Sequence, residues 1–146
     1  MDNLQSECLT IPMPPSPTVL VVDDYLDALH VWDLYLRSVG FHVLIAADGP
    51  SALELVHEHR PDVIVLDLEL PGLSGFDVAR TLRAQPDTRH IPIIAATGYS
   101  NAAQLDAARQ CGIDVIVVKP CDPESLVAEI QRLLDASSSN SMSAAE

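Results

Sequence analysis

Basic residues are scarce in this sequence. Its 146 residues include 21 acidic and 8 basic side chains, which gives a formal net charge of −13. A nucleic acid backbone repels such a charge, and the sequence contains no basic stripe, so we expect no direct binding to nucleic acid. The single lysine, Lys119, ends an apolar run directly before Pro120. This placement indicates either a specific role or chance in a chain that otherwise uses arginine.

Cysteines and long hydrophobic runs are also few. The three cysteines, Cys8, Cys111 and Cys121, are too scattered for a disulfide framework, and their odd number fits a reducing cytosol. No apolar run approaches the roughly 20 residues needed to span a bilayer. The first residues lack the basic and apolar segments of a signal peptide. We therefore expect a cytoplasmic protein that does not insert into a membrane.

Length and composition predict one folded domain with short tails. Hydrophobic residues make up 48% of the chain and charged residues 20%, which is sufficient for a core. Residues 1–17 contain four of the eleven prolines and predict a flexible N-terminal extension. Residues 136–146 are small and polar and predict a disordered tail. The predicted folded domain is therefore 18–135.

Within this domain, short apolar runs alternate with helical patterns. Four of the five runs are nearly continuous, as in strands buried on both faces of a parallel sheet, whereas His42 interrupts the second run and indicates an edge strand. The alternation predicts an open, doubly wound α/β fold with a five-stranded parallel sheet. The predicted strands are 18–23, 41–46, 62–67, 91–96 and 114–118, and the predicted helices are 25–39, 50–59, 75–85, 100–111 and 122–135.

Polar residues stand where four of these strands end: Asp23 and Asp24, Asp67, Thr97, and Lys119. Functional groups gather at the carboxyl ends of strands in such folds. Neighbouring carboxylates repel unless a cation neutralises them, and oxygen ligands select a hard cation such as Mg²⁺. Lysine and threonine can bind phosphoryl oxygens. Taken alone, the aspartate pair fits a strand end with a helix cap, and the threonine fits a turn; together the five residues predict phosphoryl transfer to a carboxylate.

Four segments carry a resemblance to a known family. They are VLVVDD (19–24), VIVLDLELPGLSGFD (63–77), IPIIAATG (91–98) and VIVVKP (115–120). With these motifs in this order and spacing, the sequence resembles the receiver domain of bacterial two-component response regulators over residues 18–135. The resemblance implies a flavodoxin-like (βα)5 fold with strand order 2-1-3-4-5.

The resemblance also implies how the site binds its metal and its phosphoryl donor. Asp67 would accept a phosphoryl group from a phosphohistidine on a sensor histidine kinase or a histidine phosphotransfer protein. Asp23, Asp24 and Asp67 would hold Mg²⁺ (or Mn²⁺), directly or through water. The backbone carbonyl of Glu69 would complete the protein ligands.

Further residues are implied to respond to the phosphoryl group. Lys119 would bind it, and Thr97 would move to hydrogen-bond to it. The peptide bond between Lys119 and Pro120 is expected to be cis in this family.

Three positions concern the side-chain switch of this family and the lifetime of its phosphoryl group. The family usually has Tyr or Phe three residues before the lysine, whereas this sequence has Ile116. We therefore expect a weakened or altered switch, in which the output face responds less or the signal leaves through another surface. The positions of Glu69 and Tyr99 tune phosphate lifetime in the family; the alternative is that both are ordinary exposed loop side chains.

The first predicted helix offers a candidate docking surface. Its core face is predicted from helical spacing, and its outer apolar residues suggest a docking patch for a phosphotransfer partner. The alternative is that Trp32 folds back and covers the edge of the core. The predicted core residues are Ala28, Val31, Tyr35 and Val39, and the predicted outer residues are Leu26, Leu29 and Trp32.

Three functions are consistent with the sequence. The favoured one is a single-domain response regulator, because nothing after residue 135 is long enough for an output domain; it would be a phosphoacceptor rather than an enzyme. Its output would be contact with an unidentified protein or onward phosphotransfer. The second is a phosphatase of the haloacid dehalogenase type, although Glu69 replaces the second aspartate of that motif and turnover of a phosphomonoester would be required. The third is a pseudo-receiver that binds partners without phosphorylation.

Overall fold

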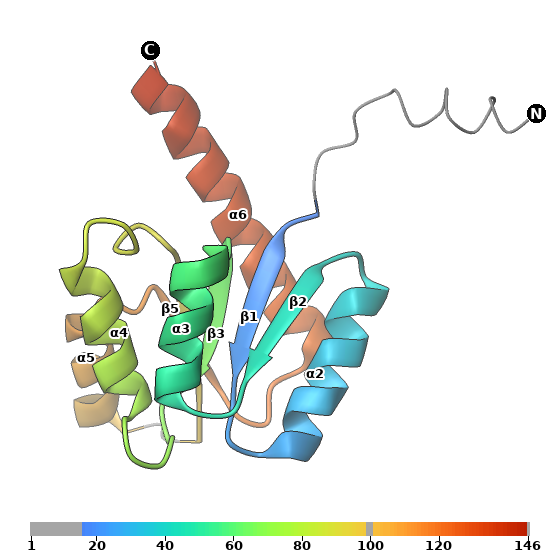
Figure 1. Cartoon of the computed structure of the whole chain (residues 1–146), viewed down its shortest axis with the longest axis vertical. Coiled ribbons are helices and arrows are strands. Elements are labelled where there is room, and N and C mark those ends of the chain that lie inside the picture. Colours follow the sequence, from blue (N-terminus) through green and yellow to red (C-terminus); the bar gives the residue numbers. More distant parts are fainter. Residues whose placement is uncertain (1–15, 99–100, 146) are drawn as a thin grey trace, which may run out of the picture.

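Five parallel strands form the centre of the fold (Figure 1). The computed structural model describes residues 16–98 and 101–145. The strand order is β2-β1-β3-β4-β5, which confirms the predicted doubly wound fold and places β2 at an edge of the sheet. The strands are β1 (Thr18–Val22), β2 (His42–Ala46), β3 (Val63–Asp67), β4 (Ile93–Thr97) and β5 (Val115–Val118), and the helices are α2 (Leu26–Ser38), α3 (Gly49–His59), α4 (Gly75–Ala84), α5 (Ala102–Gln110) and α6 (Pro123–Ala145).

The two faces of the sheet are covered by different helices. In β1, Leu20 and Val22 pack in a core that includes residues of α3, α4 and α5, whereas Val19 and Val21 pack in a second core with α2 and α6. In Figure 1, α3 and α4 lie in front of the sheet and α6 lies behind it. Burial on both faces explains why the strands are almost continuously apolar. All five carboxyl ends then meet at one edge, where the polar residues are.

Arg83 joins the two segments that precede β4 and β5 at the opposite, amino-terminal edge of the sheet. Its Nε donates to the carbonyl of Gly112 at 2.9 Å, and its Nη1 donates to the carbonyls of Arg89 and Ile91 at 2.9 and 2.7 Å. Its Nη2 lies 2.9 Å from Oδ2 of Asp114. Burial lowers the pKa of the Arg83 guanidinium, and the ion pair opposes that effect. Sequence analysis did not identify this side chain as structural.

The buried face of α2 differs from the predicted one. Val31 and Val39, predicted in the core, are 61% and 44% exposed, whereas Leu29 and Leu36 are buried. Trp32 is half-buried and packs against the same core, as in the alternative in which it covers the core edge. The helix carries apolar residues on most of its circumference, so helical spacing alone fits more than one face. Packing on β1 and β2 selects the face.

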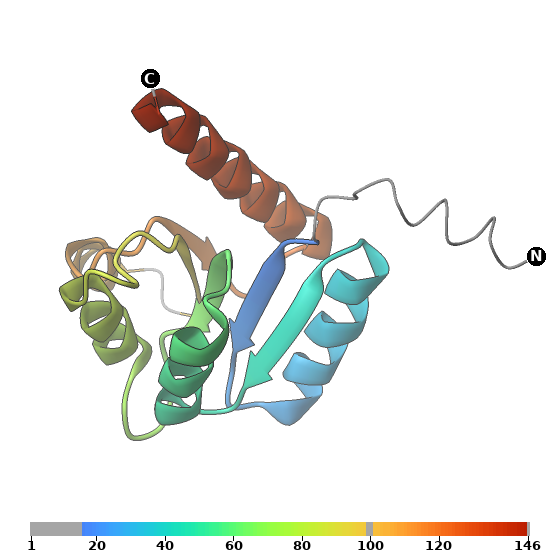
Figure 2. The same ribbon diagram turned by 45° about the horizontal axis from the view of Figure 1, so that its top comes forward.

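The predicted disordered tail over 136–146 is wrong for most of its length. In the structure α6 continues to Ala145 and projects past the amino-terminal edge of the sheet (Figure 2). After Pro123 the helix contains no further proline and no glycine, so no residue interrupts it. Within the described part of the chain, no helix is long and apolar enough to cross a membrane. Most of the predicted extension over 1–17 lies outside the described residues.

Candidate functional site

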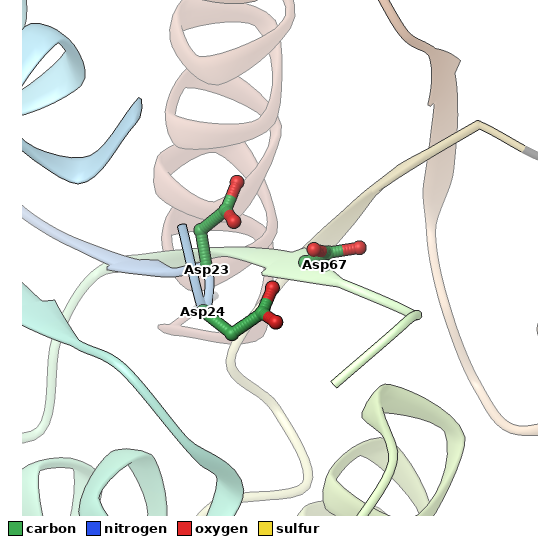
Figure 3. Close-up of side chains that lie close together, drawn as sticks. All are labelled: Asp23, Asp24 and Asp67. Carbon is green, nitrogen blue, oxygen red and sulfur yellow. The ribbon is translucent and has the colours of Figure 1, made fainter. Parts of the chain in front are cut away.

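Three carboxylates meet at the carboxyl ends of β1 and β3 (Figure 3). Asp23 and Asp24 follow β1, and Asp67 is the last residue of the adjacent β3. Each offers one carboxylate oxygen, and these oxygens lie within 4.8 Å of one another. Asp23 and Asp67 are buried, whereas Asp24 is exposed. The donor set is oxygen only and remains open to solvent on one side, which fits Mg²⁺ with several retained waters.

Lys119 places one cation beside two of these carboxylates. Its Nζ lies 3.1 Å from Oδ2 of Asp23 and 3.3 Å from Oδ2 of Asp67. Burial by itself lowers the pKa of Lys119, but attraction to Asp67 and Asp23 outweighs it and raises the pKa above its ordinary value. Lys119 therefore stays charged at neutral pH. One cation for three carboxylates leaves a net negative site, so the electrostatics also favour a metal cation.

Asp67 is held in a fixed orientation. Its Oδ1 accepts a hydrogen bond from the backbone N–H of Glu69 at 2.9 Å, while Oδ2 faces Lys119. Burial raises the pKa of Asp67 above its ordinary value, and repulsion from Asp23 adds to that effect, although the hydrogen bond and the lysine oppose it. The carboxylate is therefore a desolvated anion beside a cation. This arrangement suits a nucleophile toward phosphorus, because little water must be removed before reaction.

The backbone of Asp67 and Leu68 is tightly packed against the start of α4. Gly75 donates its N–H to the carbonyl of Leu68 at 3.3 Å. A Cβ atom at Gly75 would collide with the carbonyl oxygen of Asp67 and would lie 2.7 Å from Cα of Leu68. Ser74 and Asp77 form a capping box that fixes the first turn of α4. Residue 75 must therefore be glycine for α4 to reach this position.

The remaining predicted site residues are placed as follows. Thr97 ends β4 and is buried, and its carbonyl accepts a hydrogen bond from the backbone N–H of Lys119 at 2.8 Å. The Lys119–Pro120 peptide bond is cis, as the resemblance implies. Ile116 lies in β5, half-buried against the core shared with α3, α4 and α5. Tyr99 lies outside the described residues.

A cavity that sequence analysis missed opens beside the carboxylates. It has a volume of about 500 Å³ and extends from the acidic site between α2 and the start of α6. Its lining combines apolar side chains of the sheet with Trp32 of α2 and Cys121. Burial raises the pKa of the Cys121 thiol. Ala28 and Ala96 are among the cavity's lining residues, and no local sequence pattern distinguishes them from ordinary core residues.

Comparison with known sequences identifies the family. The chain matches the response regulator receiver domain over residues 19–131. It is 34% identical over 131 residues to the probable transcriptional regulator ycf27 of Guillardia theta, covering 90% of this chain and 50% of that one. It is 37% identical over 116 residues to the DNA-binding response regulator MtrA of Mycobacterium tuberculosis, covering 80% and 50%. The chain thus spans about half the length of the curated relatives it matches.

Solved structures show the same fold. The chemotaxis protein CheY4 of Vibrio cholerae superposes with a TM-score of 0.77 at 30% identity, covering 81% of this chain and 98% of that one. The receiver domain of the sensor histidine kinase PA1611 of Pseudomonas aeruginosa superposes with a TM-score of 0.76 at 32% identity, covering 82% and 98%. That structure has a magnesium ion coordinated in its active site cleft.

The chain belongs to the response regulator receiver domain family of two-component signalling. Members of this family are signalling phosphoacceptors that interact with histidine kinases, and they bind Mg²⁺ at an acidic pocket. The family assignment replaces the alternative of a phosphatase of the haloacid dehalogenase type. This chain carries a cluster of three aspartates, Asp23, Asp24 and Asp67, that could hold a metal ion.

The raised pKa of Asp67 predicts that its charge destabilises the metal-free protein. Because folding raises this pKa above 3.8, the folded state favours the protonated carboxyl, and the ionised carboxylate opposes folding above the raised pKa. The Asp67→Asn variant should therefore be more stable than the wild type at pH 7 without Mg²⁺. We expect a Tm higher by roughly 4 °C, which corresponds to about 1 kcal/mol in a domain of this size. The gain should disappear as the pH falls below 3.8.

Thermal unfolding followed by circular dichroism measures this effect. Asp24→Asn, at an exposed position, is the matched control and should change Tm less. Saturating Mg²⁺ should raise the Tm of the wild type and narrow the difference from Asp67→Asn, because the metal binds only the folded state. An Asp67→Asn variant that is no more stable than the wild type at pH 7 would contradict the prediction.

Proposed function

We propose that Asp67 accepts a phosphoryl group from a phosphohistidine of a sensor histidine kinase or a histidine phosphotransfer protein, and that the phosphorylated domain signals through protein contacts. One observation carries the proposal. The buried carboxylate of Asp67 lies 3.3 Å from Lys119 and within a cluster of three carboxylates that fits a hard cation. The same residues correspond to the motifs that carry the family resemblance.

Each residue has a role in this transfer. A bond forms between an oxygen of Asp67 and phosphorus as the bond from phosphorus to the donor imidazole nitrogen breaks, and the nitrogen electron pair returns to the imidazole. Asp23, Asp24 and Asp67 hold Mg²⁺ with the backbone carbonyl of Glu69, and the metal when bound neutralises charge on the transferred oxygens.

Lys119 and Thr97 act on the phosphoryl group itself. Lys119 already contacts the carboxylate of Asp67, and after transfer it pairs with the negatively charged phosphoryl oxygens. Thr97, at the end of the neighbouring strand, donates a hydrogen bond from its hydroxyl to one of these oxygens. Because Ile116 is half-buried in the core, the altered switch at this position involves repacking of an aliphatic side chain.

The donor would approach over the first turn of α2. This helix begins two residues after Asp24, and Tyr25 and Leu26 are 63% and 64% exposed. Val31 is exposed on the next turn. Apolar side chains exposed beside a reactive group suit a transient contact that positions the donor histidine.

Intact mass spectrometry tests the proposed function. The wild type, incubated with acetyl phosphate and Mg²⁺, should gain the mass of one phosphoryl group. Asp67→Asn and the wild type in EDTA should gain none, whereas Asp106→Asn, an exposed aspartate of α5, should behave as the wild type. A folded wild type that gains no phosphoryl group from acetyl phosphate or from a phosphohistidine-bearing protein would overturn the proposal in favour of a pseudo-receiver. Rapid transfer from Asp67 to a second histidine protein would identify a phosphotransfer intermediate.

A further inference from the structure

Glu69 connects the phosphoacceptor to the segment that follows β4. Its backbone N–H donates to Oδ1 of Asp67 at 2.9 Å. Its side chain reaches in another direction, and Oε1 accepts a hydrogen bond from the backbone N–H of Gly98 at 3.3 Å. The two strands involved are neighbours, with Asp67 of β3 paired to Ala96 of β4. One residue thus contacts both the reactive carboxylate and the first N–H after β4.

The Gly98 N–H is the only described hydrogen-bond partner of the Glu69 carboxylate. Among the described residues, no arginine, lysine or histidine forms an ion pair with Glu69, and the residue is exposed. An exposed glutamate is free to extend into water, and holding it in one conformation reduces side-chain entropy. The bond to Gly98 therefore indicates that the segment after β4 presents a donor that favours an anion at this edge of the site.

A phosphoryl group on Asp67 would be a second anion beside this donor. It carries up to two negative charges, and its three free oxygens require partners on more than one side. Lys119 supplies one side, from the end of β5. On another side lies the end of β4, which is placed between β3 and β5 and is followed directly by Gly98. One N–H cannot bind two anions well, and the carboxylate and the phosphoryl group would repel each other.

We propose that Glu69 is a positioning residue whose carboxylate occupies the Gly98 N–H in the resting protein and yields it to a phosphoryl oxygen when Asp67 is phosphorylated. Phosphorylation is then an exchange of one anion for another at the end of β4. The exchange breaks the hydrogen bond that joins Glu69, after β3, to Gly98, after β4. This inference rests on the proposed function of Asp67 as the phosphoacceptor.

The length of the side chain distinguishes this exchange from simple charge repulsion. Glu69→Asp keeps the charge, but its side chain is one methylene shorter and cannot span to Gly98. Glu69→Gln keeps the reach and removes the charge. Glu69→Ala removes both. If the hydrogen bond matters, aspartate should resemble alanine; if only charge matters, aspartate should resemble glutamate.

The first measurement is the amide resonance of Gly98 in the unphosphorylated, ¹⁵N-labelled protein. Loss of a bond to a carboxylate should shift the Gly98 proton upfield in both Glu69→Asp and Glu69→Ala, with a smaller change in Glu69→Gln. Glu54→Ala, an exposed glutamate of α3, should leave it in place. A Gly98 amide that is unchanged in Glu69→Asp and Glu69→Ala would overturn the proposal, whatever the outcome of phosphorylation.

The second measurement is the affinity for beryllofluoride, a phosphoryl analogue, in the presence of Mg²⁺. Without a resident carboxylate to displace, Glu69→Ala and Glu69→Asp should bind it roughly fivefold more tightly than the wild type, as expected for one hydrogen bond. Glu69→Asp binding with wild-type affinity would overturn the exchange in favour of charge repulsion alone. Failure of the wild type to bind beryllofluoride would overturn both the phosphoacceptor assignment and the exchange, while the Gly98 amide would still report the resting contact.

Discussion

Replacing Gly75 by alanine should destabilise the domain by roughly 2–3 kcal/mol, the upper part of the usual range for overpacking a core. The added methyl group would meet backbone atoms of Asp67 and Leu68 rather than a flexible side chain. Relief requires α4 to move away from the end of β3, which breaks the bond from the Gly75 N–H to the Leu68 carbonyl. The higher helix propensity of alanine offsets only about 1 kcal/mol. Urea unfolding measures the change in free energy.

Gly72→Ala is the matched control for this substitution. Gly72 also lies in the turn before α4, but nothing approaches its Cβ position within 4 Å. Its φ of +72° is left-handed, so alanine should cost only about 1 kcal/mol there. Because the clash involves the backbone of Asp67, Gly75→Ala should also weaken Mg²⁺ binding in the folded protein. Equal stabilities for the two variants would show that the helix shifts without difficulty.

Replacing Arg83 by alanine should destabilise the domain by roughly 2–4 kcal/mol, because four acceptors, two of them in part-buried hydrogen bonds, lose a charged donor together. The lost partners are the carbonyls of Gly112, Arg89 and Ile91 and the carboxylate of Asp114. Asp114 also accepts a hydrogen bond from the Ile93 N–H at 2.8 Å, so the loss loosens the start of β4. Chemical denaturation at neutral pH is again the measurement.

Two further variants isolate the cause of the Arg83 effect. Arg80→Ala lies on the same helix, where Arg80 is mostly exposed and pairs with Asp77, so it should change stability by about 0.5 kcal/mol or less. Arg83→Lys keeps the charge but loses the planar fork, so it should recover only part of the stability. Mg²⁺ affinity should stay at the wild-type value in the folded Arg83→Ala protein, because Arg83 lies at the opposite edge of the sheet from Asp67. An Arg83→Ala protein as stable as Arg80→Ala would contradict the expected role of this residue.

The sequence predicted the sheet and the acidic cluster because both depend on short patterns. Buried parallel strands leave apolar runs, and the residue that ends each run must lie at the shared carboxyl edge. Asp23, Asp67 and Lys119 therefore come together in the structure as predicted. The family resemblance then supplied the expected roles.

Contacts that depend on three-dimensional packing were not predictable in the same way. The α2 helix has apolar residues on most sides, so its buried face is decided by the sheet; Leu36 is buried and Val31 is exposed. Arg83 precedes a polar segment in the sequence, which is typical of a surface residue. Its carbonyl partners are brought to it only by the fold. The bond from Gly98 to Glu69 spans 29 positions and depends on the path of two loops.

The site is assembled from the ends of strands that are distant in the sequence, and this distance has a consequence for quality control in the cell. Lys119 and Asp23 are 96 positions apart, and neither lies near Asp67 until β1, β3 and β5 occupy one sheet. A chain whose last strand is not docked has an aspartate at position 67 but no cation beside it. If Asp67 is the phosphoacceptor proposed above, such a chain would accept a phosphoryl group poorly. Copies without a docked β5 would then transmit no signal, rather than a false one.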